Sequence, residues 1–450
     1  MSRAGAGAGA GATNAAERSM GLGLRVLNRL AGSELLDRTG QRRRVERLVF
    51  RGARGGFRAA GATSRGFSAA SRLARPARQA PARAPELFDV RPDEEQRLLR
   101  ESIGAFATEK LRPAALAADA AGAAPARLLA QANELGMAML GVPEELGGVI
   151  SQRSAVTGVL AAEALAHGDM GIALAALAPG AVASALGLWG DAEQQSTYLP
   201  SFTGADPPAA ALAILEPRAL FDPFKLATRA RRREGDWVLS GAKTLVPRAC
   251  EDELLVVAAD AEGLGPALFL LESSTRGVFS EREPAMGVRA AATGRLVLED
   301  ARVPAAALLA GGSGEVYGEC VQRARIAWCA LAVGVAQAAL DYLVPYVNER
   351  VAFGEPISNR QAVAFALADV GIELEGMRLL TYRAASRADM GKSFAREAAL
   401  ARRLCARQGA RIGSEAVQLL GGHGYVKEHP VERWYRDLRA VGVIEGALLV

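Results

Sequence analysis

Residues 237–257 read WVLSGAKTLVPRACEDELLVV, in which two short apolar runs are separated by polar and turn-forming residues. Further runs of this kind are LFL at 268–270 and LVL at 296–298. Short apolar runs bounded by turns are typical of β-strands. We therefore predict an antiparallel β-domain of roughly a hundred residues, placed at 208–310.

Both flanks of this region have helical patterns instead. On the N-terminal side, residues 92–95 read PDEE, and acidic residues in a first turn suit the positive end of a helix dipole. On the C-terminal side, apolar residues recur at helical spacing from 321 to 420, as in a helix bundle. The predicted fold class is α+β and mostly α. It has an N-terminal helical domain at 86–207, the middle antiparallel β-domain, and a C-terminal four-helix bundle at 311–450.

The segment from Met170 to Gly190 contains no charged residue and is about long enough to cross a bilayer. Pro179 interrupts it, and alanine and glycine dominate its composition. We predict two buried helices that join near Pro179, and not a membrane span.

The first 85 residues differ from the rest in charge. They hold 17 arginines and four acidic residues, whereas the whole chain has a net charge of only +5, so the remainder is acidic. Apolar residues recur at helical spacing among the arginines of residues 22–50. This basic, partly disordered arm at 1–85 would contact a membrane surface or an acidic partner, or pack on its own chain, and these interpretations stay open. It lacks a nucleic-acid-binding motif and interleaved aromatic residues, so no nucleic-acid partner is expected.

Cysteine usage bears on the compartment. The four cysteines are scattered without a CxxC pair, which favours a reducing, intracellular compartment. No histidine or cysteine cluster has zinc-ligand spacing, so no metal site is expected. Residues 65–85 resemble a mitochondrial presequence, but the arm reaches residue 85 and includes Glu34, Asp37 and Glu46. We favour a bacterial cytoplasmic protein, with the mitochondrial matrix or a peripheral membrane location as alternatives.

Several short motifs follow one another along residues 88–447. They are VPEELGG at 142–148, QQSTYLP at 194–200, WVLSGAK at 237–243, RVAFGEPI at 350–357, QLLGGHG at 418–424, ERWYRD at 432–437 and the pair Glu445-Gly446. In this order they resemble the acyl-CoA dehydrogenase family. The resemblance implies that family's fold, and α,β-dehydrogenation of an acyl-CoA thioester to the trans-2-enoyl-CoA with FAD as cofactor. It also implies an electron-transfer flavoprotein as partner and a homodimer or homotetramer.

The same resemblance assigns cofactor contacts. Arg350 matches an arginine that reaches the FAD pyrophosphate of a neighbouring subunit, a task that suits the planar donor fork of a guanidinium. Phe353 would lie near the flavin or adenine, and two glycines would let the backbone approach phosphate closely. Without the resemblance, these positions read as a surface arginine, a core phenylalanine, solvated glutamines and a helix C-cap. The full set is Arg350, Phe353, Gln361, Gln418, Gly421 and Gly422.

Glu445 matches the position of the family's catalytic base. The α-proton of a thioester is weakly acidic, so a base must remove it while the flavin accepts hydride and water is excluded. Apolar neighbours at Val441, Val443, Ile444 and Leu448 would strengthen a carboxylate as a base through desolvation. Taken alone, a glutamate at this place in the sequence is more often a solvated residue.

Arg325 lies in the segment ARIAW at 324–328. Its position resembles that of a substrate-side arginine of the family, so it is the predicted substrate-binding residue. A salt bridge within the helix bundle is the alternative for the same residue.

The β-domain departs from the family pattern where the flavin ring is expected. The family's LTEPxxGSD reads LEPRALFD at 215–222, so its Thr, Gly and Ser are all replaced. The tryptophan of the family's WIT contacts aligns with Leu245, and the threonine with Pro247, which has neither a hydroxyl nor an N–H to offer.

Three interpretations of these departures stay open. They are a dehydrogenase with altered flavin contacts, an FAD-sharing subunit of a heteromer, and a non-catalytic assembly or membrane-associated protein that retains the fold. Joint retention of Arg350, Gln418 and Glu445 favours the first two.

Overall fold

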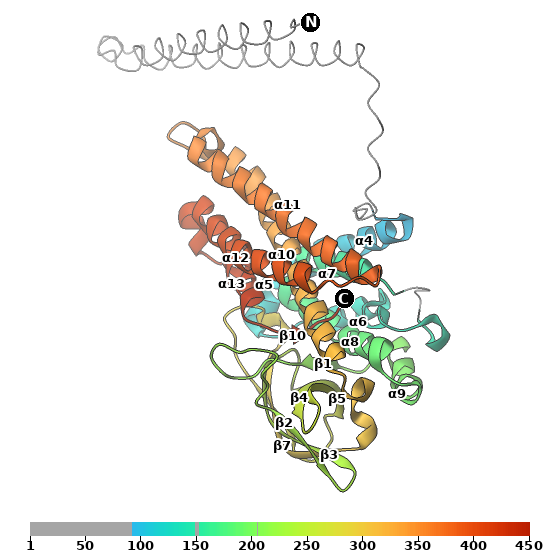
Figure 1. Cartoon of the computed structure of the whole chain (residues 1–450). Coiled ribbons are helices and arrows are strands. Elements are labelled where there is room, and N and C mark those ends of the chain that lie inside the picture. Colours follow the sequence, from blue (N-terminus) through green and yellow to red (C-terminus); the bar gives the residue numbers. More distant parts are fainter. Residues whose placement is uncertain (1–91, 149–152, 205) are drawn as a thin grey trace, which may run out of the picture. The chain divides into compact units, whose positions relative to one another are not determined.

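The computed structural model describes residues 92–148, 153–204 and 206–450 (Figure 1). The predictions for the basic arm at 1–85 lie outside these residues. In the described part, helices come first, strands follow, and long helices come next, before one short final strand. This order confirms the predicted fold class of helical N- and C-terminal parts around a middle β-domain.

The first described helix begins at the predicted point. The Asp93 carboxylate accepts a 2.8 Å hydrogen bond from the Gln96 N–H, and the Gln96 side chain accepts one from the Asp93 N–H, so the two residues satisfy donors at the helix start. The N-terminal helices are α4 (Glu94–Phe106), which continues through a π-helical turn (Ala107–Leu111) into α5 (Arg112–Ala121), then α6 (Ala126–Glu134), α7 (Ala155–Gly168), α8 (Met170–Trp189) and α9 (Ala192–Tyr198).

Helix α8 corrects the prediction of two helices joined at Pro179, because it runs unbroken past this residue. A proline inside a helix removes a hydrogen bond and clashes with the preceding turn. Close packing offsets that cost: α8 is buried along nearly its whole length, and a Cβ on Gly180 would lie 2.5 Å from the Met137 carbonyl oxygen. By length and composition, α8 and α10 (Gly314–Glu349) could each cross a membrane, but 83% and 78% of their apolar windows are buried inside the protein. Both therefore serve as core helices here.

An eight-stranded sheet forms the middle of the chain, in the order β10-β1-β4-β2-β3-β7-β6, with β5 paired to β4. The four predicted runs lie in β3, β4, β5 and β7, but the sheet is mixed and not antiparallel, since β1 and β2 both run parallel to β4. Apolar runs do not encode strand direction, and the long connection after β1 permits the crossover that a parallel pair needs. The strands are β1 (Ala210–Ala213), β2 (Arg229–Arg233), β3 (Asp236–Val246), β4 (Leu254–Ala261), β5 (Gly265–Glu272), β6 (Val278–Arg282), β7 (Gly294–Val303) and β10 (Gly446–Ala447).

Helix α10 is the centre of the C-terminal part and contacts α7, α11 and α12 (Figure 1). Small residues allow this close approach, since a Cβ on Gly334 would lie 2.2 Å from the Glu163 carbonyl oxygen of α7. The long helices lie within the predicted bundle region. The elements after α10 are the short strands β8 (Val351–Ala352) and β9 (Glu355–Pro356), then α11 (Gln361–Asp389), α12 (Ala395–Leu420) and α13 (Val431–Leu438).

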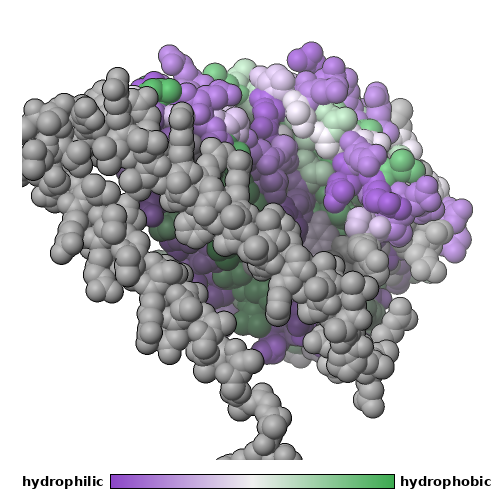
Figure 2. All heavy atoms as spheres, turned by 90° about the horizontal axis from the view of Figure 1, so that it is seen from above, coloured by the Kyte–Doolittle hydropathy of each residue, from purple (hydrophilic) through white to green (hydrophobic). Residues whose placement is uncertain are grey.

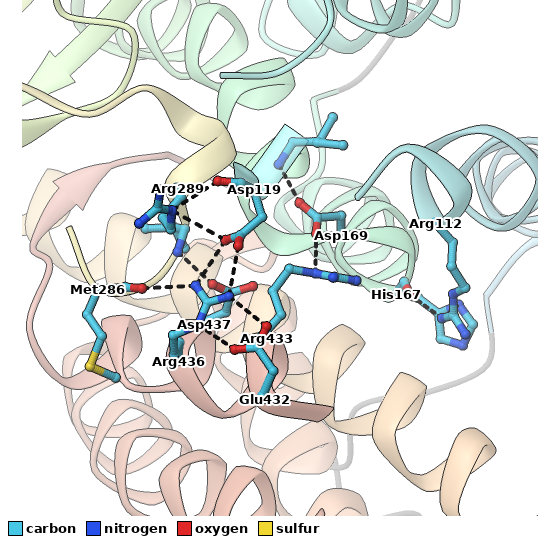
Figure 3. Close-up of polar contacts among 12 residues, drawn as sticks. Arg112, Asp119, His167, Asp169, Met286, Arg289, Glu432, Arg433, Arg436 and Asp437 are labelled. Carbon is cyan, nitrogen blue, oxygen red and sulfur yellow. Dashed lines mark hydrogen bonds and ion pairs between the residues drawn. The ribbon is translucent and has the colours of Figure 1, made fainter. Parts of the chain in front are cut away.

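A buried charge junction connects the three parts of the fold (Figure 3). Asp169 accepts a hydrogen bond at the start of α8 and forms a 3.2 Å ion pair with Arg433 of α13. Asp437, also of α13, accepts a 2.6 Å hydrogen bond from the Val288 N–H in the loop before β7. Residues of the ERWYRD motif therefore hold α13 against the start of α8 and against the loop before β7.

The junction predicts a pH-dependent stability. Burial, followed by the charge of Asp169, raises the pKa of Asp437 to about 8, whereas an ordinary aspartate titrates near ~4. Asp437 therefore keeps its proton in the folded state at pH values where the unfolded state has lost it. The resulting contribution to the free energy of unfolding is full below the unfolded pKa and is lost as pH rises through about 8. Asp437→Asn removes it while keeping an oxygen for the Val288 N–H. As pH rises, we expect the free energy of unfolding of Asp437→Asn to increase relative to that of the wild type. Urea unfolding at several pH values measures this difference. The exposed substitution Asp369→Asn serves as the control, and parallel curves for Asp437→Asn and wild type would contradict the assignment.

Candidate active site

The backbone of Glu445 is fixed by the sheet and by α10. Strand β10 follows directly and pairs with β1, placing Gly446 opposite Ala213. Trp328 of α10 donates a 2.8 Å hydrogen bond to the Gly446 carbonyl oxygen. Gly446 has a φ of +79°, and a Cβ there would lie 2.8 Å from the Ile214 side chain. Both facts explain why glycine follows the glutamate.

Two arginines approach the carboxylate of Glu445. Arg325 of α10 donates three hydrogen bonds to it, at 2.8, 3.0 and 3.1 Å, in a charge-assisted fork. Arg402 of α12 lies 3.7 Å from the same carboxylate and donates a 2.7 Å hydrogen bond to the Ile444 carbonyl oxygen. The Glu445 side chain is 11% exposed. The structure thus shows the salt bridge that was the alternative for Arg325, and its partner is the predicted base.

Arg402 belongs to no motif and was not among the predicted site residues. Burial lowers the pKa of Arg402, and the charge of Glu445 acts in the opposite direction. Its Nη1 atom is buried without a hydrogen-bond partner. Only the packing of α12 brings it to Glu445, so no local pattern could have indicated it.

The predicted apolar surroundings of Glu445 are present with one exception. Val441, Ile444 and Leu448 are buried in the main hydrophobic core. Val443 is exposed, so its predicted role as an apolar neighbour is wrong. It lies in a short turn where successive side chains cannot all face inward.

The predicted cofactor residues lie toward the far end of α10. Tyr346, near that end, forms hydrogen bonds with His423 at 2.8 Å and with the Leu420 carbonyl oxygen at 3.3 Å, which ties α10 to the glycine turn after α12. Arg350 is exposed about one turn beyond Tyr346. Along one helix, Arg325 and Arg350 are separated by roughly 37 Å. Within one chain, therefore, Arg350 does not meet Glu445.

The RVAFGEPI motif forms a tight hairpin between β8 and β9. Its two central residues, Phe353 and Gly354, have φ values of +56° and +86°, as a two-residue hairpin turn requires. The turn leaves the Phe353 ring 93% exposed, which excludes the core role that was its alternative. Gln361, the first residue of α11, is also exposed.

This end of the bundle has features that fit a phosphate-bearing ligand. Gly421 has a φ of +59° and a ψ of −131°, and an added Cβ at Gly421 or Gly422 would meet nothing within 4 Å. The backbone there is open to close approach. Among the described residues, the Arg350 side chain has no hydrogen bond or ion pair, and Gln418 is exposed in the last turn of α12. A dinucleotide such as FAD would find a free guanidinium and open backbone on one surface.

The altered loop of the β-domain is held by a buried ion pair. The Lys243 ammonium lies 3.0 Å from Glu216 and donates to the Ile214 carbonyl oxygen at 3.2 Å. The Glu216 carboxylate also accepts from the N–H groups of Ala227 and Thr228, at 2.7 and 2.8 Å. This arrangement pins both ends of loop 217–226. Phe221, which stands where the family pattern has serine, is half-buried, and Pro247, which stands where it has threonine, is buried. Neither side chain has a hydroxyl.

Among the described residues, no group of three or more histidine, cysteine, aspartate or glutamate side chains is arranged so that it could hold a metal ion. The expectation of no metal site stays a prediction. The four cysteines are all free thiols, and only Cys250 is exposed.

Known proteins match this chain along nearly all of its described length. Residues 93–206, 211–301 and 312–448 match the families described as the N-terminal, middle and C-terminal domains of acyl-CoA dehydrogenase. The chain therefore belongs to the acyl-CoA dehydrogenase family.

Individual relatives agree with this assignment. The short-chain specific acyl-CoA dehydrogenase, mitochondrial, of Bos taurus is 35% identical over 365 residues, covering 78% of this chain and 87% of the relative. Butyryl-CoA dehydrogenase from Megasphaera elsdenii has a similar structure, with a TM-score of 0.74 at 30% identity over 80% of this chain and 96% of that one. A structure described as the electron transferring flavoprotein of Acidaminococcus fermentans gives a TM-score of 0.73 at 30% identity, with the same coverage.

Proposed function

We propose that this protein catalyses α,β-dehydrogenation of an acyl-CoA thioester, with Glu445 as the base that removes the α-proton. The observation that carries the proposal is a nearly buried carboxylate at the family's base position, held by α10, α12 and the sheet edge. FAD, when bound, would supply the acceptor for the hydride that leaves the β-carbon. Similar chains solved with FAD or FADH2 support this cofactor.

Glu445 must leave the Arg325 fork before it can meet a substrate. All three side-chain hydrogen bonds of Arg325 go to Glu445, and its side chain is 22% exposed, twice the fraction of Arg402. Arg402 is also anchored to the Ile444 carbonyl oxygen. Arg325 is therefore the partner that moves aside when a thioester enters. Arg402 stays and retains one positive charge beside the base.

The cofactor site is proposed to form between two copies of the chain. Because Arg350 lies far along α10 from Arg325, one chain would offer the base and another the guanidinium. An apolar stripe on α11 supports a homo-oligomer, since Phe365, Ile372 and Leu379 are all exposed at seven-residue spacing, and such stripes mark interfaces. On the face seen in Figure 2, hydrophobic side chains lie in patches between hydrophilic ones.

Mixing two inactive variants tests this shared site. Arg350→Met should weaken FAD binding by roughly ten- to a hundredfold, because a charge-assisted contact is lost, and Glu445→Gln removes the base. When the two variant chains are mixed, one site of each hybrid pair is intact, so about a quarter of wild-type activity should return. The exposed substitution Arg407→Met is the control for FAD affinity. No recovery on mixing would mean that each site lies within one chain.

An anaerobic screen of acyl-CoAs tests the function itself. The FAD-loaded protein should lose its visible flavin absorbance when a suitable acyl-CoA is added. A protein that takes up FAD but is not reduced by any acyl-CoA would exclude the dehydrogenase. A protein that takes up FAD only when a second gene product is present would instead favour the heteromeric subunit. The altered flavin-ring contacts at Leu245 and Pro247 are the reason for testing this alternative.

An electron-transfer flavoprotein is the proposed electron acceptor, and the likeness to the Acidaminococcus fermentans structure supports it. We place the protein in the bacterial cytoplasm, for which the free thiols are the supporting observation. Contact of the basic arm with a membrane surface is a further proposal, based on its sequence alone.

A further inference from the structure

The backbone carbonyl groups on either side of Glu445 are each held by a side chain from a different helix. Arg402 of α12 donates a 2.7 Å hydrogen bond to the Ile444 carbonyl oxygen. Trp328 of α10 donates one of 2.8 Å to the Gly446 carbonyl oxygen through its indole N–H. Trp328 is fully buried and the Arg402 side chain is 11% exposed, so water does not readily replace either hydrogen bond. We refer to these two side chains, Trp328 and Arg402, as the carbonyl clamp.

The segment that follows Glu445 has an unusual backbone conformation. Gly446 and Ala447 have φ values of +79° and +71°, so two successive residues lie in the left-handed region. Glycine adopts this region readily, but alanine does so only where the surrounding structure holds it there. Pairing with β1 places Gly446 opposite Ala213 and Ala447 opposite Leu212. The conformation next to the base is therefore imposed by packing and hydrogen bonds, and not by local preference.

A fixed backbone matters here because the Glu445 carboxylate has to change partners. In the structure it accepts hydrogen bonds from Arg325, and the proposed dehydrogenation requires it to leave that fork and approach an α-carbon. When the carbonyl groups on both sides are held, the backbone stays in place and only the side-chain torsions of Glu445 rotate. The carboxylate then reaches a defined position. Proton transfer requires this, since a displacement of about 1 Å can lower a rate ~100-fold.

We propose that the carbonyl clamp positions the base: it keeps the backbone of Glu445 fixed while the carboxylate moves from Arg325 to the substrate. This inference rests on the proposed dehydrogenase function and adds two positioning residues to it. The two residues differ in charge. Arg402 also lies 3.7 Å from the Glu445 carboxylate, so its loss changes the charge beside the base. The Trp328 indole is uncharged and its N–H bonds to the backbone, so a Trp328 variant isolates the effect of position.

The test measures anaerobic flavin reduction in the FAD-loaded full chain, with the acyl-CoA that reduces the wild type fastest in the screen described above. Trp328→Phe keeps an aromatic ring but removes the indole N–H, so the limiting rate at saturating acyl-CoA should fall roughly ten- to a hundredfold. The acyl-CoA concentration that gives half of this rate should stay within about twofold of the wild-type value, because only the base is displaced. Trp237→Phe, which changes a comparably buried tryptophan of β3, is the matched control and should leave the rate near that of the wild type. An unchanged limiting rate in Trp328→Phe would overturn the proposal.

Variants of Arg402 test the other half of the carbonyl clamp. Arg402→Met removes the donor to the Ile444 carbonyl oxygen and should lower the limiting rate, whereas Arg402→Lys can still donate and should recover part of the loss. Because both side chains act on one backbone segment, the loss in the double variant Trp328→Phe/Arg402→Met should be smaller than the product of the two single losses. Arg403→Met, at an exposed arginine of the same helix, is the control. Losses that multiply independently would show that the two residues do not act together, and the proposal would fail.

Amide hydrogen exchange gives a readout that needs no catalysis. Loss of either clamp residue should speed exchange in residues 444–447 by roughly tenfold while the rest of the described fold exchanges as in the wild type, because only a local opening becomes easier. Faster exchange throughout the core would instead indicate a general loss of stability and would count against the proposal, as would unchanged exchange at 444–447. If the local effect is present but no acyl-CoA reduces the wild-type flavin, the dehydrogenase function fails and the carbonyl clamp stands.

Discussion

Replacing Glu445 by Gln should slow flavin reduction by an acyl-CoA roughly 100- to 10,000-fold, the range that a general base contributes. Glutamine has almost the same shape and can still accept from Arg325, but it cannot take up the α-proton. The cofactor residues lie at the other end of α10, so FAD content should stay near that of the wild type. Stopped-flow measurement of flavin absorbance under anaerobic conditions gives the rate, and the absorbance spectrum gives the FAD content.

Two companion variants sharpen this result. Glu445→Asp keeps the charge but shortens the reach, so it should retain more activity than Glu445→Gln. Loss of the carboxylate also leaves Arg325 and Arg402 without a counter-charge, so the melting temperature must be measured for both variants. Unchanged flavin reduction in a folded Glu445→Gln protein would remove Glu445 from the mechanism.

The second large effect concerns the ion pair under the β-domain loop. Lys243→Met should lower the free energy of unfolding by roughly 3–5 kcal/mol, because it leaves the buried Glu216 carboxylate with only the half-exposed Arg218 guanidinium, 3.8 Å away, as counter-charge. Lys243 is fully buried and the Glu216 side chain is 2% exposed, so water cannot replace the lost charge. Urea unfolding of the full chain measures the change.

A lysine of the same loop offers a matched control. The Lys225 side chain is 81% exposed and 3.8 Å from Asp222, so Lys225→Met should change stability by less than ~0.5 kcal/mol. Adding Glu216→Gln to Lys243→Met should recover part of the loss, since it removes the stranded charge and keeps one acceptor for the Thr228 N–H. A loss below ~1 kcal/mol in the single Lys243→Met variant would show that the pair does not hold the loop.

Much of the architecture could be predicted from local patterns. The start of α4 follows from PDEE at 92–95, and the β-rich runs mark β3, β4, β5 and β7. Two predictions were wrong for physical reasons that lie outside local sequence. Helix α8 continues through Pro179 because burial against its neighbours outweighs the cost of the proline. The mixed sheet could not be predicted because a run of apolar residues does not indicate which strands pair or in which direction.

The candidate site divides in the same way. Motifs identified Glu445, Arg350 and the glycines at 421 and 422, and the roles that the family implies for them stay predictions. Motifs gave no sign of Arg402, because its role depends on what packs around it. Arg402 matters because α12 brings it to within 3.7 Å of the Glu445 carboxylate.

The sequence alone determined the family, the succession of helices, strands and helices, and the glutamate that serves as the candidate base, because these depend on periodicity and on motifs read along the chain. Only the tertiary structure decided that this glutamate is held by two arginines and that the predicted cofactor residue Arg350 lies far from it along α10. Charge pairing and burial are properties of space, and they bring together groups that are more than a hundred residues apart in the chain.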